Sequence, residues 1–370
     1  MPAFSPDVHT YSLDVGGLAA AIVVSPTALG SGTVIRIQGD EVPSADESDP
    51  VPIAPGGVQP ILVETTASDG VATSSYTVLV LRALLDSATL EAYLKKHAHV
   101  TDALGLRYDA DHHFGYAVAL SGDTLVVGAP GESSAAGFSG RNPSDNAALF
   151  AGAAYVFTFR PHPTRGTRFT LGSPGAWFFD TYLKAPVPDP FDLFGASVSV
   201  SGRRIVVGAP GEDGGFGTSA ALLTDNSALD AGAAFLFTRT GVTWGSPQIL
   251  KADQPSAGDH FGTSVSVSGL IVAVGAPDED GSGVGVAPPV DELRPGSGAA
   301  HVFVIGPPWL PPLYVKAHVP DPGDAFGTSV AVSGDTLVVG AIDEQSIALG
   351  VNGDATDDTG PALGAAYVYR

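Results

Sequence analysis

The sequence predicts an all-β protein, a β-propeller of four-stranded antiparallel blades that follows a small β-sandwich. Three observations support this prediction. Four short motifs recur in the same order through residues 91–370, each motif is rich in β-branched or small residues, and turn residues separate the motifs. Tandem units of four antiparallel strands are typical of propeller blades, which pack sheet against sheet around an axis.

The first two motifs predict a β-hairpin at the start of each repeat. Phe-Gly begins the first motif, and Gly-Ala-Pro or a near match follows fourteen residues after each Phe. The motifs start at Phe114 and Gly128, Phe194 and Gly208, Phe261 and Gly275, and Phe326 and Gly340. A Ser-Gly dipeptide between them favours a tight turn. The second strand is apolar at nearly every position, so we expect both of its faces to be buried.

The third and fourth motifs predict the third and fourth strands of each repeat, and the fourth is the outer edge of the blade. Gly-Ala-Ala, followed by an aromatic residue or His, begins at Gly152, Gly232, Gly298 and Gly364. The fourth motif contains all the lysines of the chain, Lys95, Lys96, Lys184, Lys251 and Lys316. A Lys on an outer strand discourages sheets from pairing edge to edge, and we favour this interpretation. The alternative is a ring of cations that binds a ligand.

The sequence leaves open how the propeller is completed. The chain ends at Arg370, directly after the third motif, and a spare copy of the fourth motif (AYLKKH, residues 92–97) precedes the first repeat. We hypothesise that this segment completes the last blade and closes a four-bladed ring, the low end of the propeller range. The alternatives are a larger ring with further blades and an amphipathic linker helix over residues 84–98.

Residues 1–83 differ from the repeats and predict the preceding β-sandwich. Short strands are expected near residues 11–15, 33–37, 60–65 and 76–81, with Pro, Gly, Ser and Asp clusters between them. The sequence thus predicts two domains, residues 1–83 and residues 84–370.

The composition excludes several classes of protein. Acidic residues number 39 against 17 Lys and Arg, and the net charge of −22 argues against an electrostatic grip on nucleic acid. The chain has no cysteine, so it forms no disulfide and holds no thiolate-bound metal. No apolar run is long enough to cross a membrane, and the first residues lack the pattern of a signal peptide. We therefore expect either a cytoplasmic protein or a piece of a longer exported one.

The acidic residues gather in loops that the predicted fold places on one face. Because chain direction alternates from strand to strand, the loops between blades and the loops between second and third strands emerge on the same side. These loops hold most of the 39 acidic residues and three basic ones, Arg107, Arg141 and Arg294. We expect a strongly negative face that attracts cations or basic partners.

Two acidic positions recur in every repeat and are candidate calcium ligands. They are Glu132, Glu212, Glu279 and Glu344 after Gly-Ala-Pro, and Asp145, Asp225, Asp291 and Asp357 before Gly-Ala-Ala. A third position, before Phe, holds Asp192, Asp259 and Asp324, with Asp111 one place earlier in the first repeat. Converging hard oxygens suit Ca²⁺, which takes about six to eight of them. The competing interpretation is that these carboxylates accept hydrogen bonds from loop amides and hold the turns.

The joint pattern resembles the FG-GAP repeat of integrin α-subunit propellers and, more closely, of bacterial FG-GAP proteins. Tyr182-Leu-Lys-Ala, Phe326-Gly-Thr-Ser-Val-Ala-Val-Ser-Gly-Asp and Val351-Asn-Gly-Asp carry the resemblance over about residues 91–370. Residues 3–83 resemble a bacterial cadherin-like β-sandwich without its first strand, through Ala3-Phe-Ser-Pro-Asp and Tyr76-Thr-Val-Leu-Val-Leu-Arg. Integrin calcium loops lie between strands one and two, where this sequence has Ser-Gly turns, so their ligands are not carried over.

The resemblance implies a surface or secreted propeller that binds a partner through the loops of one face. We therefore expect a non-enzymatic extracellular or cell-surface binding or adhesion module, whose acidic face contacts a protein or glycan, with Ca²⁺ as the candidate cofactor. The sequence contains no Gly-x-Ser-x-Gly, His-Glu-x-x-His or Gly-Lys-Ser/Thr motif, so no catalytic residue is assigned. The alternatives are a propeller enzyme that acts on polysaccharide or phospholipid, and a purely structural segment of a large surface protein.

Overall fold

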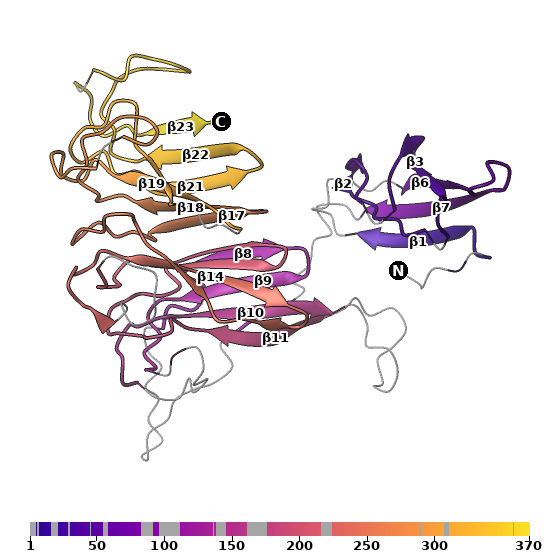
Figure 1. Ribbon diagram of the computed structural model, residues 1–370, viewed down its shortest axis with the longest axis horizontal. Helices are drawn as coiled ribbons and strands as arrows, with labels where there is room; N and C mark the ends of the chain where they lie inside the picture. The colour runs from indigo at the N-terminus through magenta and orange to yellow at the C-terminus, as the bar shows by residue number, and fades with distance from the viewer. Residues whose placement is uncertain are drawn as a thin grey trace. The chain divides into compact units, whose positions relative to one another are not determined.

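The computed structural model (Figure 1) describes residues 5, 7–15, 21–28, 30–44, 46–54, 58–82, 92–95, 112–135, 137, 146–160, 176–215, 224–288, 290–306, 311–357 and 359–370. The regular elements in these ranges are β-strands, as the sequence predicts. The chain divides into two compact units, residues 1–93 and residues 94–370.

The N-terminal unit contains the four strands predicted before the repeats. Its strands are β1 (Thr10–Val15), β2 (Ala21–Ile22), β3 (Val34–Ile37), β4 (Asp40–Glu41), β5 (Val51–Pro52), β6 (Val58–Thr66) and β7 (Thr73–Arg82). The main sheet has the order β1-β7-β6-β3-β4, and β2 pairs with β5. Ile37, Ile53, Ile61 and Val80 are buried together and form the core of this unit. Predicted strands near 11–15, 33–37, 60–65 and 76–81 are therefore present as β1, β3, β6 and β7.

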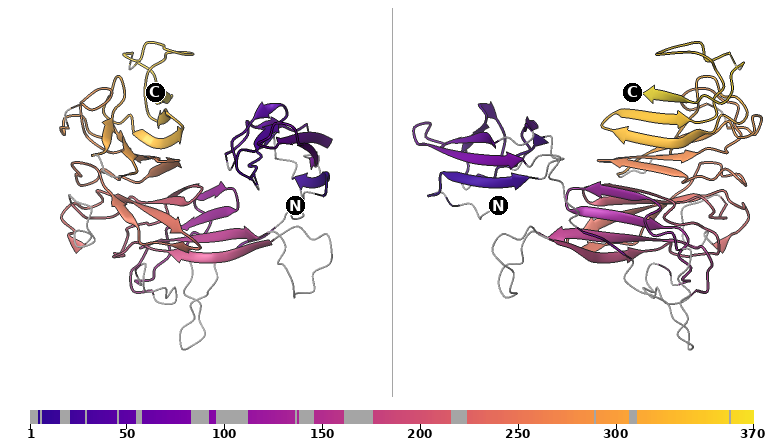
Figure 2. Two further views of the ribbon diagram at one scale, coloured as in Figure 1. Left: turned by 45° about the vertical axis from the view of Figure 1, so that its right-hand side comes forward. Right: turned by 180° about the vertical axis from the view of Figure 1, so that it is seen from behind.

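The second unit consists of four successive antiparallel sheets, which are the predicted blades (Figures 1 and 2). The first blade contains β8 (Val118–Ser121), β9 (Thr124–Ala129), β10 (Ala153–Arg160) and β11 (Ala176–Leu183). The second contains β12 (Ser197–Ser201), β13 (Arg204–Ala209), β14 (Ala233–Thr240), β15 (Thr243–Trp244) and β16 (Gln248–Leu250). The third contains β17 (Ser264–Ser268), β18 (Ile271–Ala276), β19 (Ala299–Val304) and β20 (Leu313–Val315). The last contains β21 (Phe326–Ser333), β22 (Thr336–Ala341) and β23 (Ala365–Tyr369).

Each blade starts with a hairpin whose two-residue turn begins with glycine. Gly122, Gly202, Gly269 and Gly334 have φ angles of 57°, 53°, 55° and 57°. Each follows the Ser that ends the first strand of its blade. A positive φ at the first central residue is the requirement of a type II′ turn, which suits the twist of a β-hairpin. The predicted Ser-Gly turns are confirmed.

The blades pack face to face through aromatic side chains. Their backbones also approach so closely at some positions that only glycine fits there. Phe194, Phe235 and Phe237 are buried between the first and second blades. A Cβ atom at Gly208 would collide with the carbonyl oxygen of Gly262 in the next blade. The glycine of Gly-Ala-Pro therefore sets how closely adjacent blades approach.

The hypothesis that residues 92–97 complete the last blade is wrong in this structure. Described residues 92–95 form no strand, and the last sheet has the order β21-β22-β23 without a fourth member among the described residues. Leu94 instead packs against the first blade, beside Phe114 and Tyr155. The described blades form no closed ring, because their hydrophobic clusters connect successive blades and none contains both the first and the last. The linker helix considered for residues 84–98 falls mostly outside the described residues.

Candidate functional site

The two sets of long loops lie at the same end of the blades, as the sequence predicts. The backbone N–H of Leu193 donates to the carbonyl of Phe150, His260 N–H to Asp230, and Ala325 N–H to Gly296. Each bond joins a loop between blades to the loop between second and third strands of the preceding blade. In Figure 1 these loops lie away from the hairpin turns of the blades. We call this end of the second unit the loop end.

Many carboxylates of the loop end are at least partly exposed. They are Asp189, Asp213, Asp225, Asp230, Asp253, Asp278, Asp280, Asp291, Glu292, Asp321, Asp343, Asp354 and Asp357. The described loops contain one arginine, Arg294, whose Nη1 lies 2.7 Å from Asp321 Oδ1. His260 adds a titratable cation, since its Nδ1 lies 2.8 Å from Asp278 Oδ2 and this hydrogen bond raises the histidine pKa. Among the described residues, most of these carboxylates therefore form no ion pair with a basic side chain.

The glutamates predicted as calcium ligands are instead inside the blades. Lys184 Nζ lies 2.9 Å from Glu132 Oε2, Lys316 Nζ lies 2.6 Å from Glu279 Oε2, and Lys251 forms the same pair with Glu212. All six side chains are buried. Tyrosine hydroxyls add donors, from Tyr182 to Glu132 at 2.8 Å and from Tyr314 to Glu279 at 2.5 Å.

These pairs correct both interpretations of the lysines. Lys184, Lys251 and Lys316 neither protect an exposed edge nor form a ring of cations for a ligand, because each is buried against a glutamate of its own repeat. Burial lowers the pKa of Lys316, and the Glu279 carboxylate opposes that shift. The sequence does contain a signal for this pairing: a Glu and a Lys recur at matching places of the first three repeats.

The second predicted column of acids holds turns at the loop end. Asp291 Oδ1 accepts a hydrogen bond from Ser282 N–H at 2.7 Å, and its Oδ2 accepts one from the Ser282 hydroxyl at 2.8 Å. The backbone bond from Ser282 lowers the pKa of Asp291. Asp357 Oδ1 accepts from Thr359 N–H at 3.1 Å. Asp225 is exposed, and Asp145 lies outside the described residues.

The third column of acids is buried below the loop end. Asp192 Oδ2 accepts a hydrogen bond from Asp189 N–H at 2.8 Å, and Asp259 Oδ2 accepts one from Ser256 N–H at 2.8 Å. Asp324 Oδ2 accepts from Asp321 N–H at 2.9 Å. Burial raises the pKa of Asp192 to about 8 and that of Asp259 to about 7.

The structure does not bring the two calcium columns together. Three of the glutamates contact lysines inside the blades and Glu344 accepts hydrogen bonds from Ser346, whereas Asp291 and Asp357 bond to loop backbone. Among the described residues no group of three His, Asp or Glu side chains is arranged to hold a metal ion. Calcium binding at these positions stays a prediction.

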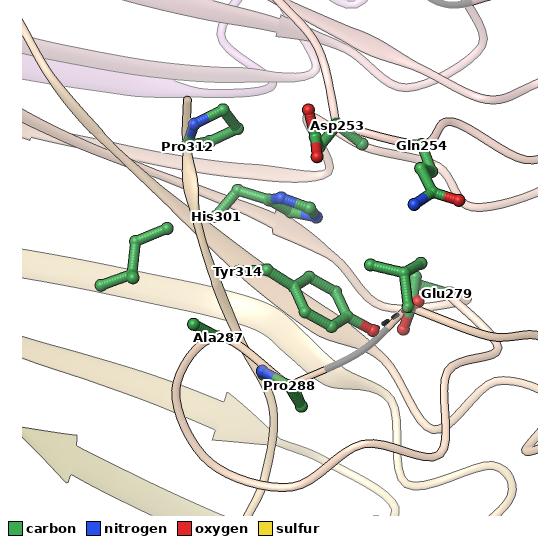
Figure 3. A pocket seen from close by; sticks show the side chains of 11 residues that line it. Asp253, Gln254, Glu279, Ala287, Pro288, His301, Pro312 and Tyr314 are labelled. Atoms are coloured by element: carbon green, nitrogen blue, oxygen red, sulfur yellow. Dashed lines mark hydrogen bonds between the residues drawn. The ribbon is translucent and has the colours of Figure 1, made fainter. Parts of the chain in front are cut away.

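A small cavity beside the third blade contains a buried histidine (Figure 3). The cavity has a volume of about 180 Å³ and is lined in part by Asp253, Glu279, His301 and Tyr314. The His301 ring packs edge-on against Phe261, with ring centroids 5.2 Å apart, in the place that an aromatic residue holds in the other repeats. Burial lowers the pKa of His301 to about 3, so the ring is neutral at physiological pH. His301 is therefore a packed side chain of the blade.

Comparison with known families divides the chain in the same way as the structure. The family described as "Cadherin-like beta sandwich domain" matches residues 1–83. The family described as "FG-GAP repeat" matches residues 108–157, 177–237, 244–303 and 317–369. Each of the last four segments covers the first three strands of one blade, and the second and third of these segments also begin with outer-strand residues of the preceding blade. No helix in the described ranges is long and apolar enough to cross a membrane.

Individual relatives share little of the chain or little of its sequence. A protein of Evansella cellulosilytica named "Putative membrane protein" is 31% identical over 98 residues, which are 26% of this chain and 14% of that protein. A quinonprotein alcohol dehydrogenase-like protein of Bacteroides thetaiotaomicron is 10% identical, with a TM-score of 0.26 over 95% of this chain and 81% of that one. SGBP-B of a Bacteroides ovatus mixed-linkage glucan utilization locus, solved with a heptasaccharide, is 12% identical, with a TM-score of 0.17 over 92% and 63%. These two structural similarities carry no argument about function.

Proposed function

The chain belongs to the FG-GAP repeat family, and on this premise we propose that it is a non-enzymatic binding module of the cell surface or of a secreted protein. Its loop end binds the partner. A protein with a basic surface is the ligand class that fits best, and a glycan that donates hydroxyl hydrogen bonds to carboxylates is the second.

The charge of the loop end is the observation that carries this proposal. Exposed carboxylates occur in the loops of the second, third and last blades. Arg294 is the single Lys or Arg in the described part of those loops. A surface of one sign attracts partners of the opposite sign and accelerates their association. The blades themselves are closely packed, so the loops are presented on a rigid support.

An enzymatic function receives less support from the same residues. A propeller enzyme would use carboxylates of the loops for catalysis, but Glu279, one of the recurrent acids there, accepts hydrogen bonds from both Lys316 and Tyr314. A carboxylate held by two buried donors is committed to the blade and is a poor general acid or base. A cell-surface location is supported by the FG-GAP family and by the name of the Evansella relative, which describes a membrane protein.

Calcium remains part of the proposal, as an ion that aspartates of the loop end bind. Asp225, Asp291 and Asp357, each in the loops of its own blade, are the candidate ligands, since the glutamates of the first three blades are engaged with lysine. A rise in melting temperature with millimolar CaCl₂, lost in Asp291→Asn, is the expected result. A melting temperature that does not move with CaCl₂ would remove the metal from the proposal.

The proposed function is tested by calorimetric titration with poly-L-lysine, a model for a basic protein surface. Two variants with equal net charge are compared. Asp253→Asn with Asp343→Asn removes two exposed carboxylates from the loop end, and Asp123→Asn with Asp335→Asn removes two from the hairpin turns at the other end.

We expect the loop-end variant to weaken binding by about an order of magnitude at low salt, and the hairpin variant to leave it nearly unchanged. Equal weakening in both variants would mean that net charge alone governs binding, which contradicts a localised site. A glycan array probed with the same pair of variants examines the second ligand class.

A further inference from the structure

The three interfaces between blades share one parallel bridge, and two of them also share a serine hydrogen bond. Ser197 Oγ donates to the carbonyl of Gly262, and Ser264 Oγ donates to that of Gly327, both at 2.7 Å. Parallel bridges join Gly152 to Phe194, Gly232 to Phe261 and Gly298 to Phe326. Every blade therefore has a front face that fits the blade before it and a rear face that fits the blade after it.

The front face of the first blade and the rear face of the last blade are open. Leu120 is 63% exposed on the front face, whereas its counterpart Val267 in the third blade is 6% exposed. On the rear face Val368 is 66% exposed, whereas its counterpart Leu236 in the second blade is 1% exposed. These open faces carry the apolar residues that the internal interfaces bury.

The last blade also contains a buried acid without the cation that its counterparts have. Glu344 is 4% exposed, and Ser346 donates to it through its N–H at 3.2 Å and its hydroxyl at 3.1 Å. No Lys, Arg or His of the described residues forms an ion pair with Glu344. The Tyr367 hydroxyl is likewise buried without a hydrogen-bond partner there. In the other blades the fourth-strand lysine compensates the glutamate, so the last blade is built to receive such a strand.

Residues 92–95 have the sequence and the position of that missing strand. Tyr93-Leu94-Lys95 matches Tyr182-Leu183-Lys184 of the first blade. Leu94 packs beside Phe114 on the front of the first blade, as Leu183 packs beside Phe194 on the front of the second. Leu94 thus lies where the equivalent residue in the fourth strand of a blade in front of the first blade would lie, and Lys95, the next residue, is exposed.

We propose that two copies of this chain associate head to tail, with the rear face of each last blade on the front face of the partner's first blade. Residues 92–95 of each copy then become the fourth strand of the partner's last blade, and Lys95 meets Glu344. Two such contacts close a ring of eight blades, within the propeller range of about four to eight. A second copy is the occupant because the front face is the one surface that the rear faces of this chain already bind, three times over. This inference concerns assembly and does not depend on the ligand of the loop end.

Sedimentation of single-site variants tests the association. The wild-type chain is expected at twice its monomer mass of 37.4 kDa. Leu120→Lys places a charge in the apolar front face, and Val368→Lys places one in the apolar rear face. Each variant by itself is expected to be monomeric. Because each keeps one intact face, an equimolar mixture of the two is expected to form a dimer again. Val242→Lys, at an exposed turn outside both faces, is the control that stays dimeric.

Engineered cysteines distinguish the second copy from closure within one chain. In the first blade Val156 pairs with Thr181, and the corresponding pair is Val368 with Ala92. The chain has no cysteine of its own, so Val368→Cys and Ala92→Cys made in separate chains form a disulfide only between copies. We expect a covalent dimer of the mixture under oxidising conditions, which reduction dissolves. A monomeric wild type, a mixture of the Lys variants that stays monomeric, or a disulfide that forms only within the doubly substituted chain would each overturn the proposal.

Discussion

The third and last blades share a hairpin and a buried glutamate but differ in their fourth strand. In the third blade β20 pairs with β19, and Lys316 directly after it contacts Glu279. In the last blade β23 is the outermost described strand, and Glu344 is bonded to Ser346 instead. The difference teaches that the fourth strand supplies an interior cation as well as a strand. A blade of this protein is complete when its Glu and its Lys are both in place.

Removing one partner of a buried Glu–Lys pair lowers the free energy of unfolding by more than the intact pair contributes to it. Moving two charges out of water costs several kcal/mol for each, and the attraction between them offsets that cost when the geometry is good. Removing one partner leaves the other charge buried and uncompensated. The third and last blades should therefore respond very differently to equivalent substitutions.

The largest expected effect is the loss of the Lys316 charge. Lys316→Met leaves Glu279 buried without its cation, so we expect the free energy of unfolding to fall by about 3–5 kcal/mol. Glu344→Gln in the last blade, made in the monomeric Leu120→Lys background, removes a charge that has no ion-pair partner among the described residues, so its effect should be below about 1 kcal/mol or stabilising. Urea denaturation measures both. Equal losses for the two variants would show that the blades are energetically alike and would contradict the comparison.

A smaller effect is expected from glycine substitutions at corresponding places. Gly208→Ala puts a methyl group against the backbone of Gly262, which cannot rotate away, so we expect a loss of about 1–3 kcal/mol. At Gly340 the nearest atom is the Ser329 hydroxyl, a side chain that can turn, so Gly340→Ala should cost less than about 1 kcal/mol in the monomer. If the rear face is covered by a second copy, Gly340→Ala should still reduce dimerisation. Thermal unfolding at low and high protein concentration separates the two effects.

The last expected effect is a change in the slope of stability against pH, about 1.4 kcal/mol for each pH unit. Burial raises the pKa of Asp192 to about 8, from an ordinary value of 3.8. Between about pH 4 and pH 8 the folded protein binds a proton at this site that the unfolded chain has released, so this site's contribution makes stability fall as pH rises. Asp192→Asn should remove that slope while still accepting the bond from Asp189 N–H. For Asp259, with a pKa of about 7, the corresponding slope should end one pH unit lower. Unfolding curves at several pH values measure both, and a slope unchanged in Asp192→Asn would refute the raised pKa.

The sequence was sufficient for features that depend on local pattern. The Ser-Gly turns, the strands of each blade and the common end of the long loops follow from turn chemistry, apolar runs and alternating chain direction. It was also sufficient for the turn-holding role of Asp291, whose partner Ser282 lies nine residues away.

Features that depend on distant partners were not predicted. Lys184 and Glu132 lie 52 residues apart, and an outer-strand lysine has the same local pattern whether its head group is exposed or buried. Sequence reasoning therefore assigned the lysines to the surface, and the glutamates either to calcium or to the loop turns. The place of residues 92–95 was also misjudged, because their match to the fourth motif does not say which blade they join.

Amide hydrogen exchange along β23 tests most directly the claim that the last blade is built to receive a fourth strand. At concentrations where the chain is dimeric, the β23 amides that face away from β22 should exchange as slowly as the β19 amides that face β20. They should become fast on dilution and in Val368→Lys. Rapid exchange of these β23 amides in the concentrated wild-type protein would contradict the account.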